Sequence, residues 1–444
     1  MARLDFPADF LWGTATASYQ VEGALGEGGR GECIWDTFAR TPGKVYAGES
    51  GSVACDQYHH YKEDVALMAQ LGFKAYRFSI AWPRIIPEGR GTVNAEGVAY
   101  YKRLCDELRA HGMTACATLY HWDLPQVLED KGGWAERETA VAAGEYAKAV
   151  FKELGGCVDQ WITINEPWCV AYLGYAYGEH APGKKDFNAA MRAVHHINLA
   201  HGLMVKAHHE AGLKTPIGIT WNLATPRPAT GSAKDKEAAL IGRAFDSEVF
   251  TGPVLKKQYP EIVTRQFGYA FPVEAGDMEI IGQKIDFVGM NYYSETAVAW
   301  NEDAPRKYEG QPSWQTVSDM GWYDTPHGLL RQLRWVREIT GGTMPVYITE
   351  NGYARPDALG PDGRVHDRER VVYLQKHLQM CEKAIQEGIN LKGYFAWSFL
   401  DNFEWAWGYA RRFGIVFCDY ATLKRYPKDS AYFFRDVIAG YGEW

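Results

Sequence analysis

Residues 161–167 read Trp-Ile-Thr-Ile-Asn-Glu-Pro, and this stretch decides the fold. Its first four residues are apolar or β-branched, which is typical of a strand in a parallel sheet covered on both faces. Pro167 disfavours helical geometry in the residue before it and cannot continue the hydrogen-bond ladder, so the strand ends at Glu166. The sequence therefore places a carboxylate at the carboxyl end of a buried strand, where α/β folds carry their chemistry.

A second stretch has the same form. Residues 345–352 read Pro-Val-Tyr-Ile-Thr-Glu-Asn-Gly, so another β-prone run ends in Thr-Glu-Asn and is followed by a glycine. Glu350 is then a second carboxylate at the end of a strand. A lone glutamate in such a place is usually a structural residue in a salt bridge, whereas two of them, each beside an asparagine, favour a functional site.

Strand-like runs alternate with helix-like runs along the chain. Besides the two stretches above, we expect strands at 10–16, 75–80, 114–120, 217–222, 286–293 and 391–399. We expect helices at 59–71, 95–111, 136–154, 187–211, 234–250, 325–340 and 367–387, several of which stop at a glycine. Segment 24–57 is rich in glycine and is expected to be a long irregular loop.

This alternation predicts an α/β fold with a single domain over residues 1–444. Eight strands and about eight helices would form a parallel (β/α)8 (TIM) barrel with long loops after its strands, around the active-site face. No GxGxxG motif follows the first strand to support a dinucleotide-binding sheet instead. Polar and aromatic residues gather where the strands end, and in a barrel all of them face one pocket. They are Gln20, Arg77, His121, Trp122, Asn165, Glu166, Asn291, Tyr293, Glu350 and Trp397.

Composition and charge narrow the classes of partner. The 444 residues carry a net charge of −8 without long charged blocks, which argues against nucleic acid and anionic membranes as partners. No apolar run is long enough to span a bilayer, and the first residues lack the apolar core of a signal peptide. The eight cysteines form no CxxC motif, so we expect a cytoplasmic protein with reduced thiols, no disulfide and no structural zinc.

Two carboxylates in one pocket with aromatic side chains suit glycoside hydrolysis. One carboxyl group acts as general acid and base, and the other is either the nucleophile or the base that activates water. Glu350 is the better nucleophile, because Arg77 and the Tyr293 hydroxyl could keep it ionised. Arg77 could also be part of a structural ion pair, and Tyr293 a core residue. The strands that end in Glu166 and Glu350 would lie three steps apart, so the carboxylates would face each other across the mouth of the barrel.

Glu166 is the better acid. Trp122 and Trp168 are its expected neighbours, and an apolar wall raises the pKa of a carboxyl group. Metal catalysis is the competing class of enzyme, but the motifs HxH and HExxH are absent. His121 has no accompanying set of carboxylates and histidines, and we prefer it as a partner of a sugar hydroxyl. We therefore expect neither a metal nor another cofactor.

The chain resembles glycoside hydrolase family 1, the β-glucosidase family of retaining enzymes, from Phe10 to about Tyr432. The matching pieces are FLWGTATASYQVEG at 10–23, CDQYHHYKED at 55–64, YRFSIAWPRIIPEG at 76–89, TLYHWDLPQ at 118–126, WITINEP at 161–167, GMNYYS at 289–294, DMGW at 319–322, YITENG at 347–352 and AWSFLDNFEWAWGY at 396–409. TINEP and ITENG, in this order in one chain, are highly specific.

The resemblance implies a (β/α)8 barrel with Glu166 as acid and base and Glu350 as nucleophile. It implies partners for the hydroxyls of the non-reducing sugar at Gln20, His121, Asn165, Glu404 and Trp405, with Trp122 beside them and Trp397 as the stacking floor. It implies supports of the nucleophile at Arg77, Asn291 and Tyr293, of which Tyr293 also belongs to the substrate-binding set. Walls for the leaving group are implied at Trp168 and Trp322.

The resemblance further implies an exo-acting β-glucosidase. Such an enzyme releases glucose from the non-reducing end of small β-glucosides and cello-oligosaccharides, as in cellulose degradation, and a homo-oligomer is left open. Family members that act on 6-phosphosugars carry Ser in place of Glu404. A glutamate at this position would repel a phosphate, so a neutral sugar is expected. A β-galactosidase or β-fucosidase of the same family remains an alternative, because galactose differs from glucose only at C4. A non-catalytic sugar-binding barrel would lack one of the two glutamates.

Overall fold

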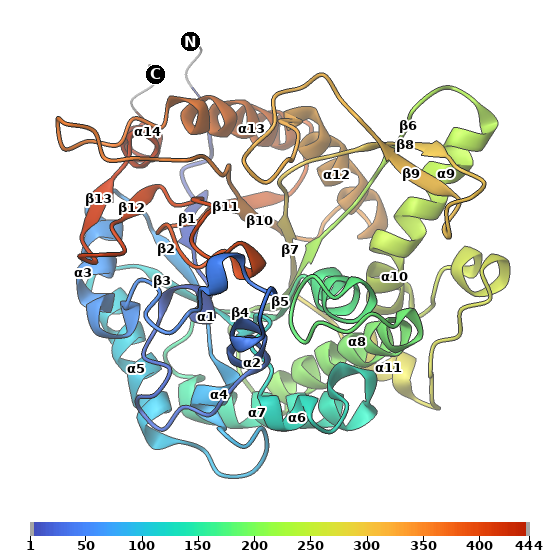
Figure 1. Cartoon of the computed structure of the whole chain (residues 1–444), viewed down its shortest axis with the longest axis horizontal. Coiled ribbons are helices and arrows are strands. Elements are labelled where there is room, and N and C mark those ends of the chain that lie inside the picture. The colour runs from blue at the N-terminus through green and yellow to red at the C-terminus, as the bar shows by residue number, and fades with distance from the viewer. Residues whose placement is uncertain (1–3, 441–444) are drawn as a thin grey trace.

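A closed parallel barrel forms the centre of the computed structural model, which describes residues 4–440. Residues 1–3 and 441–444 of the predicted domain lie outside the described residues. Within residues 4–440 the barrel has eight strands, as predicted, and Figure 1 shows them at the centre of a ring of helices. Around the barrel the order is β1 (Leu11–Ala15), β11 (Leu391–Trp397), β10 (Val346–Asn351), β7 (Phe287–Asn291), β5 (Ile217–Asn222), β4 (Gln160–Asn165), β3 (Thr114–Tyr120) and β2 (Ala75–Ser79).

The barrel strands are buried on both faces, which is why they read as continuous apolar runs. Every residue of β2 and β4 is buried. On the outside of β4, Trp161 packs edge-on against Phe151 with 5.0 Å between ring centroids. From β4 to β10 the path runs through β5 and β7, so the two glutamate-bearing strands lie three steps apart, as expected.

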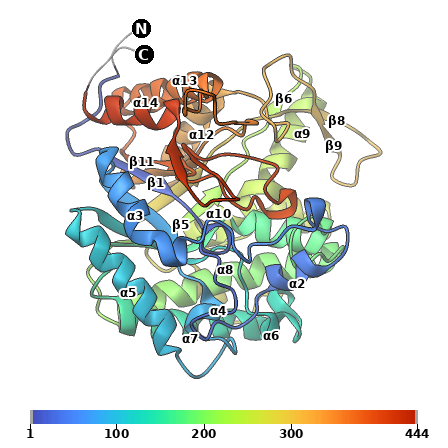
Figure 2. The same cartoon turned by 60° about the vertical axis from the view of Figure 1, so that its left-hand side comes forward.

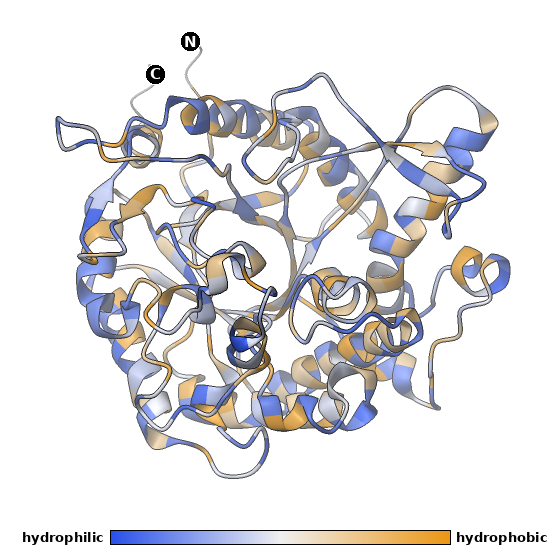
Figure 3. Ribbon diagram, viewed as in Figure 1, coloured by the Kyte–Doolittle hydropathy of each residue, from blue (hydrophilic) through white to orange (hydrophobic). Residues whose placement is uncertain are grey.

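The predicted helices form around this barrel with ends that differ by two residues or fewer, except at 234–250. They are α3 (Gln57–Gln70), α5 (Ala95–Ala110), α7 (Arg137–Leu154), α8 (Phe187–Glu210), α12 (Pro326–Ile339) and α13 (Arg368–Gln386). Local chemistry sets these ends. The Asp186 carboxylate accepts from the backbone N–H groups of Asn188 and Ala189 at the start of α8, and Gly212 follows its end with a φ of +69°. In Figure 3 these helices carry hydrophilic and hydrophobic residues together.

Two sequence predictions were wrong. Segment 24–57 is not wholly irregular, because it contains the helix α2 (Ile34–Arg40) and the 3-10 turn η1 (Tyr46–Gly48). The first turn of α2 is held by Asp36, whose carboxylate accepts from the Cys33 backbone N–H at 2.7 Å and from Arg30 at 2.8 Å. Segment 234–250 is not one helix but α9 (Ala233–Arg243), the π-helical turn η4 (Ala244–Glu248) and the start of α10 (Val249–Lys256).

Shorter elements connect or cap the barrel. They are α1 (Ser18–Val21), α4 (Trp82–Ile85), α6 (Gln126–Glu129), η2 (Gly133–Ala135), the π-helical segment η3 (Cys169–Tyr177), η5 (Ile262–Gln266), α11 (Asp277–Ile281), η6 (Trp405–Trp407) and α14 (Asp429–Ile438). Two small sheets were not predicted. One consists of β6 (Arg227–Pro228), β8 (Ala297–Trp300) and β9 (Tyr308–Gln311), and it lies beside α9 outside the barrel in Figures 1 and 2. The other consists of β12 (Val416–Cys418) and β13 (Arg425–Pro427).

Among the described residues, no helix combines the length and the apolar character needed to cross a membrane.

Candidate active site

A cavity of about 510 Å³ opens at the carboxyl ends of the barrel strands. Both glutamates line it: Glu350 lies in β10, and Glu166 directly follows β4. The other predicted residues in its lining are His121, Trp122, Trp168, Asn291, Tyr293, Trp322, Trp397, Glu404 and Trp405. Gln20, Arg77 and Asn165 are not in the lining, but each of these buried side chains bonds to a residue that is.

Glu350 is held by a cation and a phenol. Arg77 Nη1 donates to Glu350 Oε1 at 2.6 Å, and the Tyr293 hydroxyl donates to Oε2, also at 2.6 Å. Burial raises the pKa of Glu350, whereas the Arg77 charge and these hydrogen bonds oppose the rise. Burial and the Glu350 charge raise the pKa of Tyr293 well above its usual value, so this hydroxyl stays a donor at neutral pH.

Glu166 has weaker partners. Asn291 Nδ2 donates to Oε1 at 2.6 Å, and the Cys169 thiol lies 2.9 Å from Oε2. Burial, followed by repulsion from Glu350, raises the pKa of Glu166 to about 7. Since Arg77 contacts Glu350 directly, the negative charge of the pair belongs on Glu350 and the proton on Glu166.

Asn165 connects the two sides of the site from behind the cavity. Its Oδ1 accepts from Arg77 Nη2 at 2.6 Å and from Asn291 Nδ2 at 3.1 Å, which fixes the orientation of the amide. Its Nδ2 must then donate to His121 Nε2, 3.0 Å away. Burial lowers the pKa of His121 far below its usual value, so the ring is neutral and carries its proton on Nδ1.

Two of the site residues predicted from the sequence each have one buried polar atom without a partner among the described residues. These atoms are Nδ1 of His121 and Oε1 of Gln20. Gln20 Nε2 donates to Asn402 Oδ1 at 3.0 Å and to the Phe403 carbonyl at 2.9 Å, and this leaves its Oε1 as a free acceptor. A buried unpaired donor and acceptor cost free energy unless a ligand pairs with them, and a sugar hydroxyl can pair with either.

Glu404 is a third buried carboxyl group in the cavity lining. Its Oε2 lies 3.4 Å from Gln20 Nε2. Burial and the Glu350 charge raise the pKa of Glu404 to about 8, so at neutral pH it holds a proton and can donate to a ligand oxygen. This proton weakens the charge repulsion by which Glu404 was expected to exclude a phosphosugar.

Aromatic rings form much of the wall. Trp122 and Trp405 are 4.7 Å apart between ring centroids, and His121 stacks near Trp397 at 5.9 Å. Three residues here have left-handed backbone, namely Trp122 (φ +76°), Glu166 (φ +48°) and Trp405 (φ +50°). A left-handed backbone is strained in residues other than glycine and costs about 1–3 kcal/mol for each residue. Such residues typically occur at functional sites.

Cys169 and Asp246 are among the cavity residues that the sequence analysis missed. Cys169 stands three positions after Glu166, and that spacing on a helical segment was a usable signal. Asp246 accepts from Trp168 Nε1 at 3.0 Å, but it comes from the unpredicted turn η4, so no local signal pointed to it. The predicted leaving-group walls, Trp168 and Trp322, lie in the same lining.

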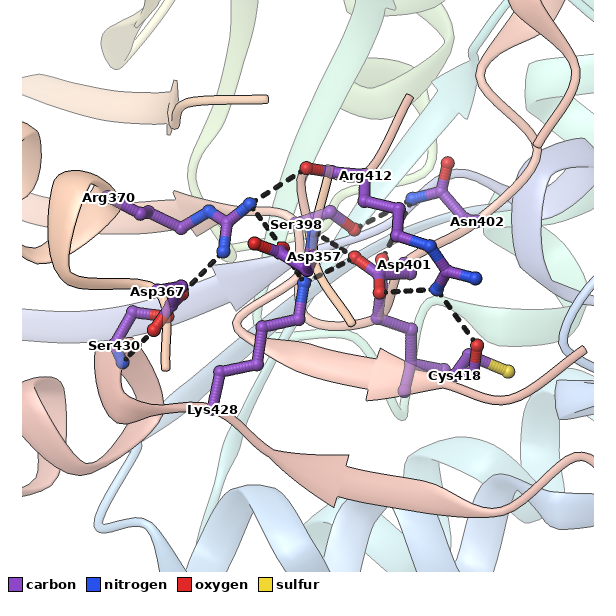
Figure 4. A network of polar contacts seen from close by, with 12 residues as sticks. Asp357, Asp367, Arg370, Ser398, Asp401, Asn402, Arg412, Cys418, Lys428 and Ser430 are labelled. Atoms are coloured by element: carbon purple, nitrogen blue, oxygen red, sulfur yellow. Dashed lines mark hydrogen bonds and ion pairs between the residues drawn. The ribbon is translucent and has the colours of Figure 1, made fainter. Parts of the chain in front are cut away.

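A buried network holds the segment that carries Glu404 and Trp405 (Figure 4). Asp401 accepts from Arg412 and from Lys428, each at 2.7 Å, and from the Gly414 N–H at 2.9 Å. Its neighbour Asn402 accepts from Gln20. We call the six charged residues of this network the clamp cluster: Asp357, Asp367, Asp401, Arg370, Arg412 and Lys428.

No group of three or more His, Cys, Asp or Glu side chains that could hold a metal ion occurs within residues 4–440. His195, which is adjacent to His196 in α8, contacts Asp277 Oδ2 through its Nε2 at 2.9 Å.

Known proteins resemble the chain over its whole length. A model of glycosyl hydrolase family 1 matches residues 2–443. Beta-glucosidase A of Thermotoga maritima is 47% identical over 440 residues, which cover 98% of each chain. A 1,4-beta-D-glucan glucohydrolase of Thermotoga neapolitana is 45% identical over 98% of this chain and 99% of its own. A solved structure of a family 1 b-glucosidase from Thermotoga maritima covers 100% of both chains with a TM-score of 0.96 at 46% identity. The resemblance found in the motifs is thus confirmed, and the chain belongs to glycosyl hydrolase family 1.

Proposed function

We propose that this enzyme is a retaining, exo-acting β-glucosidase in which Glu350 is the nucleophile and Glu166 the general acid and base. One observation carries the proposal: two buried carboxyl groups meet in one cavity with unequal partners, a guanidinium for Glu350 and an amide with a thiol for Glu166. This inequality separates an ionised group from one that holds a proton near neutral pH.

The reaction follows from this separation. A Glu350 oxygen attacks the anomeric carbon while the bond to the leaving oxygen breaks, and the Glu166 proton moves to that oxygen. The product is a covalent glycosyl-enzyme. Glu166, now a carboxylate, takes a proton from water, whose oxygen attacks the same carbon and releases Glu350. Two inversions at one carbon leave the β configuration unchanged.

The cavity also supports the sugar and the mode of action. Three polar groups can pair with hydroxyls on different carbons of one sugar ring. They are the donor His121 Nδ1, the acceptor Gln20 Oε1 and the carboxyl group of Glu404. The buried ring of Trp397 supplies an apolar face for that sugar ring. Trp322 is 37% exposed, so the leaving group would extend toward solvent on its side. Small β-glucosides and cello-oligosaccharides, with glucose as the product, fit this arrangement.

The names of the relatives agree with glucose as the preferred sugar. The predicted cytoplasmic location, the homo-oligomer and the organisation as one domain over residues 1–444 remain proposals. A panel of aryl β-glucoside, galactoside, fucoside, xyloside and 6-phosphoglucoside, together with cellobiose, tests the choice of sugar by kcat/KM. A lead for the galactoside or the phosphosugar over the glucoside would overturn that part of the proposal.

Replacement of the nucleophile tests the mechanism. Glu350→Gly should lose several orders of magnitude in kcat on an aryl β-glucoside, because no glycosyl-enzyme can form. Added azide should restore turnover and give the α-glucosyl azide, since the anion attacks from the vacated face with a single inversion. Glu88→Gln, at an exposed position outside the cavity, is the matched control. A β-glucosyl azide from the Glu350→Gly enzyme, or near-full activity without azide, would show that Glu350 is not the nucleophile.

A further inference from the structure

Cys169 occupies a place that the reaction scheme above does not use. It is the first residue of η3, it is buried, and it lines the cavity. Its sulfur lies 2.9 Å from Glu166 Oε2. On its other side, Asn222 Nδ2 donates to the sulfur at 3.4 Å.

The thiol is the donor in its contact with Glu166. Burial and the nearby Glu166 charge raise the pKa of Cys169 well above its usual value, so the sulfur keeps its proton. Because the sulfur accepts from Asn222, the S–H bond is free to point at Oε2. A thiol is a weak donor compared with an amide or a hydroxyl.

The two oxygens of Glu166 therefore have partners of unequal strength. Oε1 accepts from the Asn291 amide at 2.6 Å, a strong bond that favours an unprotonated oxygen. Among residues 4–440, only the weak thiol bond reaches Oε2, which leaves it as the more basic of the two oxygens.

We propose that Cys169 is a positioning residue for Glu166: its thiol holds the carboxyl group in place but leaves Oε2 as the oxygen that delivers and recovers the proton. An S–H group suits both steps, because it can donate to the carboxylate and can accept weakly from the protonated acid. Because Cys169 acts here through the acid and base, its role depends on the proposed function of Glu166.

Other ionisable groups also act on Glu166 and must stay unchanged in a test. They come from β10, β2, the segment after β11 and the segment after β7, and they are Glu350, Arg77, Glu404 and Tyr293. A substitution at Cys169 leaves all of them in place.

A pair of substitutions at Cys169 gives opposite expectations. Cys169→Ser supplies a stronger donor to Oε2, which stabilises the carboxylate and lowers the pKa of Glu166. The fall of kcat/KM at high pH, which reports loss of the Glu166 proton, should therefore begin about half a pH unit lower. Cys169→Ala removes the donor, which raises the pKa of Glu166, so the fall of kcat/KM at high pH should begin at a higher pH. On substrates with poor leaving groups, which need the proton most, Cys169→Ser should lose roughly threefold at neutral pH, with little change for a dinitrophenyl glucoside.

The experiment measures pH profiles of kcat/KM and thermal unfolding for both variants on both kinds of substrate. Cys157→Ser, at a half-buried cysteine beyond the opposite end of β4, is the control and should leave the profile unchanged. Shifts of both Cys169 variants in the same direction, or unmoved limbs with intact folding, would overturn the role of Cys169. Glu166→Gln separates the two ideas: if it keeps full activity on poor leaving groups, the proposed function itself fails.

Discussion

Two buried clusters of charged side chains lie next to each other in this enzyme, and they differ in charge balance. The clamp cluster of Figure 4 pairs three carboxylates with three cations. Among the described residues, three buried carboxyl groups line the cavity, Glu166, Glu350 and Glu404, and Arg77 contacts one of them.

The pKa values follow this difference. Burial alone would raise the pKa of Asp357 in the clamp cluster, but the charges of Arg370 and Lys428 outweigh it and lower that pKa. In the cavity, burial and the repulsion between carboxylates outweigh the hydrogen bonds that oppose them. They raise the pKa of Glu166 to about 7 and that of Glu404 to about 8. A balanced cluster stabilises the fold, whereas an unbalanced one keeps protons available near neutral pH.

The largest effect should come from Glu166→Gln, which separates activity from stability. Loss of the acid should cost about 10²–10⁴-fold in kcat/KM on substrates with poor leaving groups. The first step on a dinitrophenyl glucoside, followed as a burst, should survive because it needs no proton. Thermal unfolding should be unchanged or improved, since a buried carboxyl with few partners is removed. A clear loss of melting temperature would mean that Glu166 belongs with the structural charges.

Asp401→Asn should show the reverse pattern. It removes the carboxylate that Arg412 and Lys428 share, which leaves the half-buried Arg412 and the buried Lys428 each short of a partner. Such a loss typically costs about 3–5 kcal/mol of unfolding free energy. Denaturant unfolding measures this cost, with Asp106→Asn at an exposed position as the control. Unchanged stability would show that the clamp cluster does not hold the segment after β11.

The two clusters should also give opposite dependences of stability on pH. A carboxyl group with a raised folded pKa stabilises the fold at low pH, and this stability is lost as pH rises from the unfolded value of 4.5 to about 8 for Glu404. Asp357, with a lowered pKa, contributes stability above its unfolded value of 3.8 that is lost as pH falls further.

A comparison of the unfolding free energies of the wild type and of Glu404→Gln between pH 4.5 and 8 isolates the contribution of Glu404. The variant should gain a few kcal/mol at most relative to wild type as pH rises across this range. A constant difference between the two proteins would contradict the raised pKa of Glu404.

The smallest effect should come from Asn402→Ala, at the junction of the two clusters. Asn402 Oδ1 accepts from Gln20 Nε2 and so fixes the orientation of the Gln20 amide, whose Oε1 has no partner among the described residues. Loss of one such hydrogen bond should raise KM for an aryl glucoside by about 2–10-fold, with a smaller change in kcat. Asn390→Ala serves as the control, because Asn390 directly precedes β11, at the opposite end of that strand from Asn402. A fall in kcat without a change in KM would place Asn402 in another role.

Much of the fold was predictable because its signals are local. The strand at Thr114–Tyr120 and the helix ends near Gly112 and Gly212 follow from apolar runs and from residues that stop helices. The helix α2 was missed because Asp36, which holds its first turn, depends on Arg30 from the loop before it. The break of the helix at Ala244–Glu248 was missed because Asp246 is held there by Trp168 and Tyr308, which are distant in sequence.

The sequence by itself determined the barrel, the two strand-end glutamates and the family, because strand periodicity and the TINEP and ITENG motifs are properties of short segments. Only the tertiary structure decided which side chains face those glutamates. The Asn165 amide is oriented by Arg77 from β2 and Asn291 from β7, and Glu166 meets a thiol on one oxygen and an amide on the other. Proton affinity depends on such contacts and on burial, and both arise only when distant segments meet.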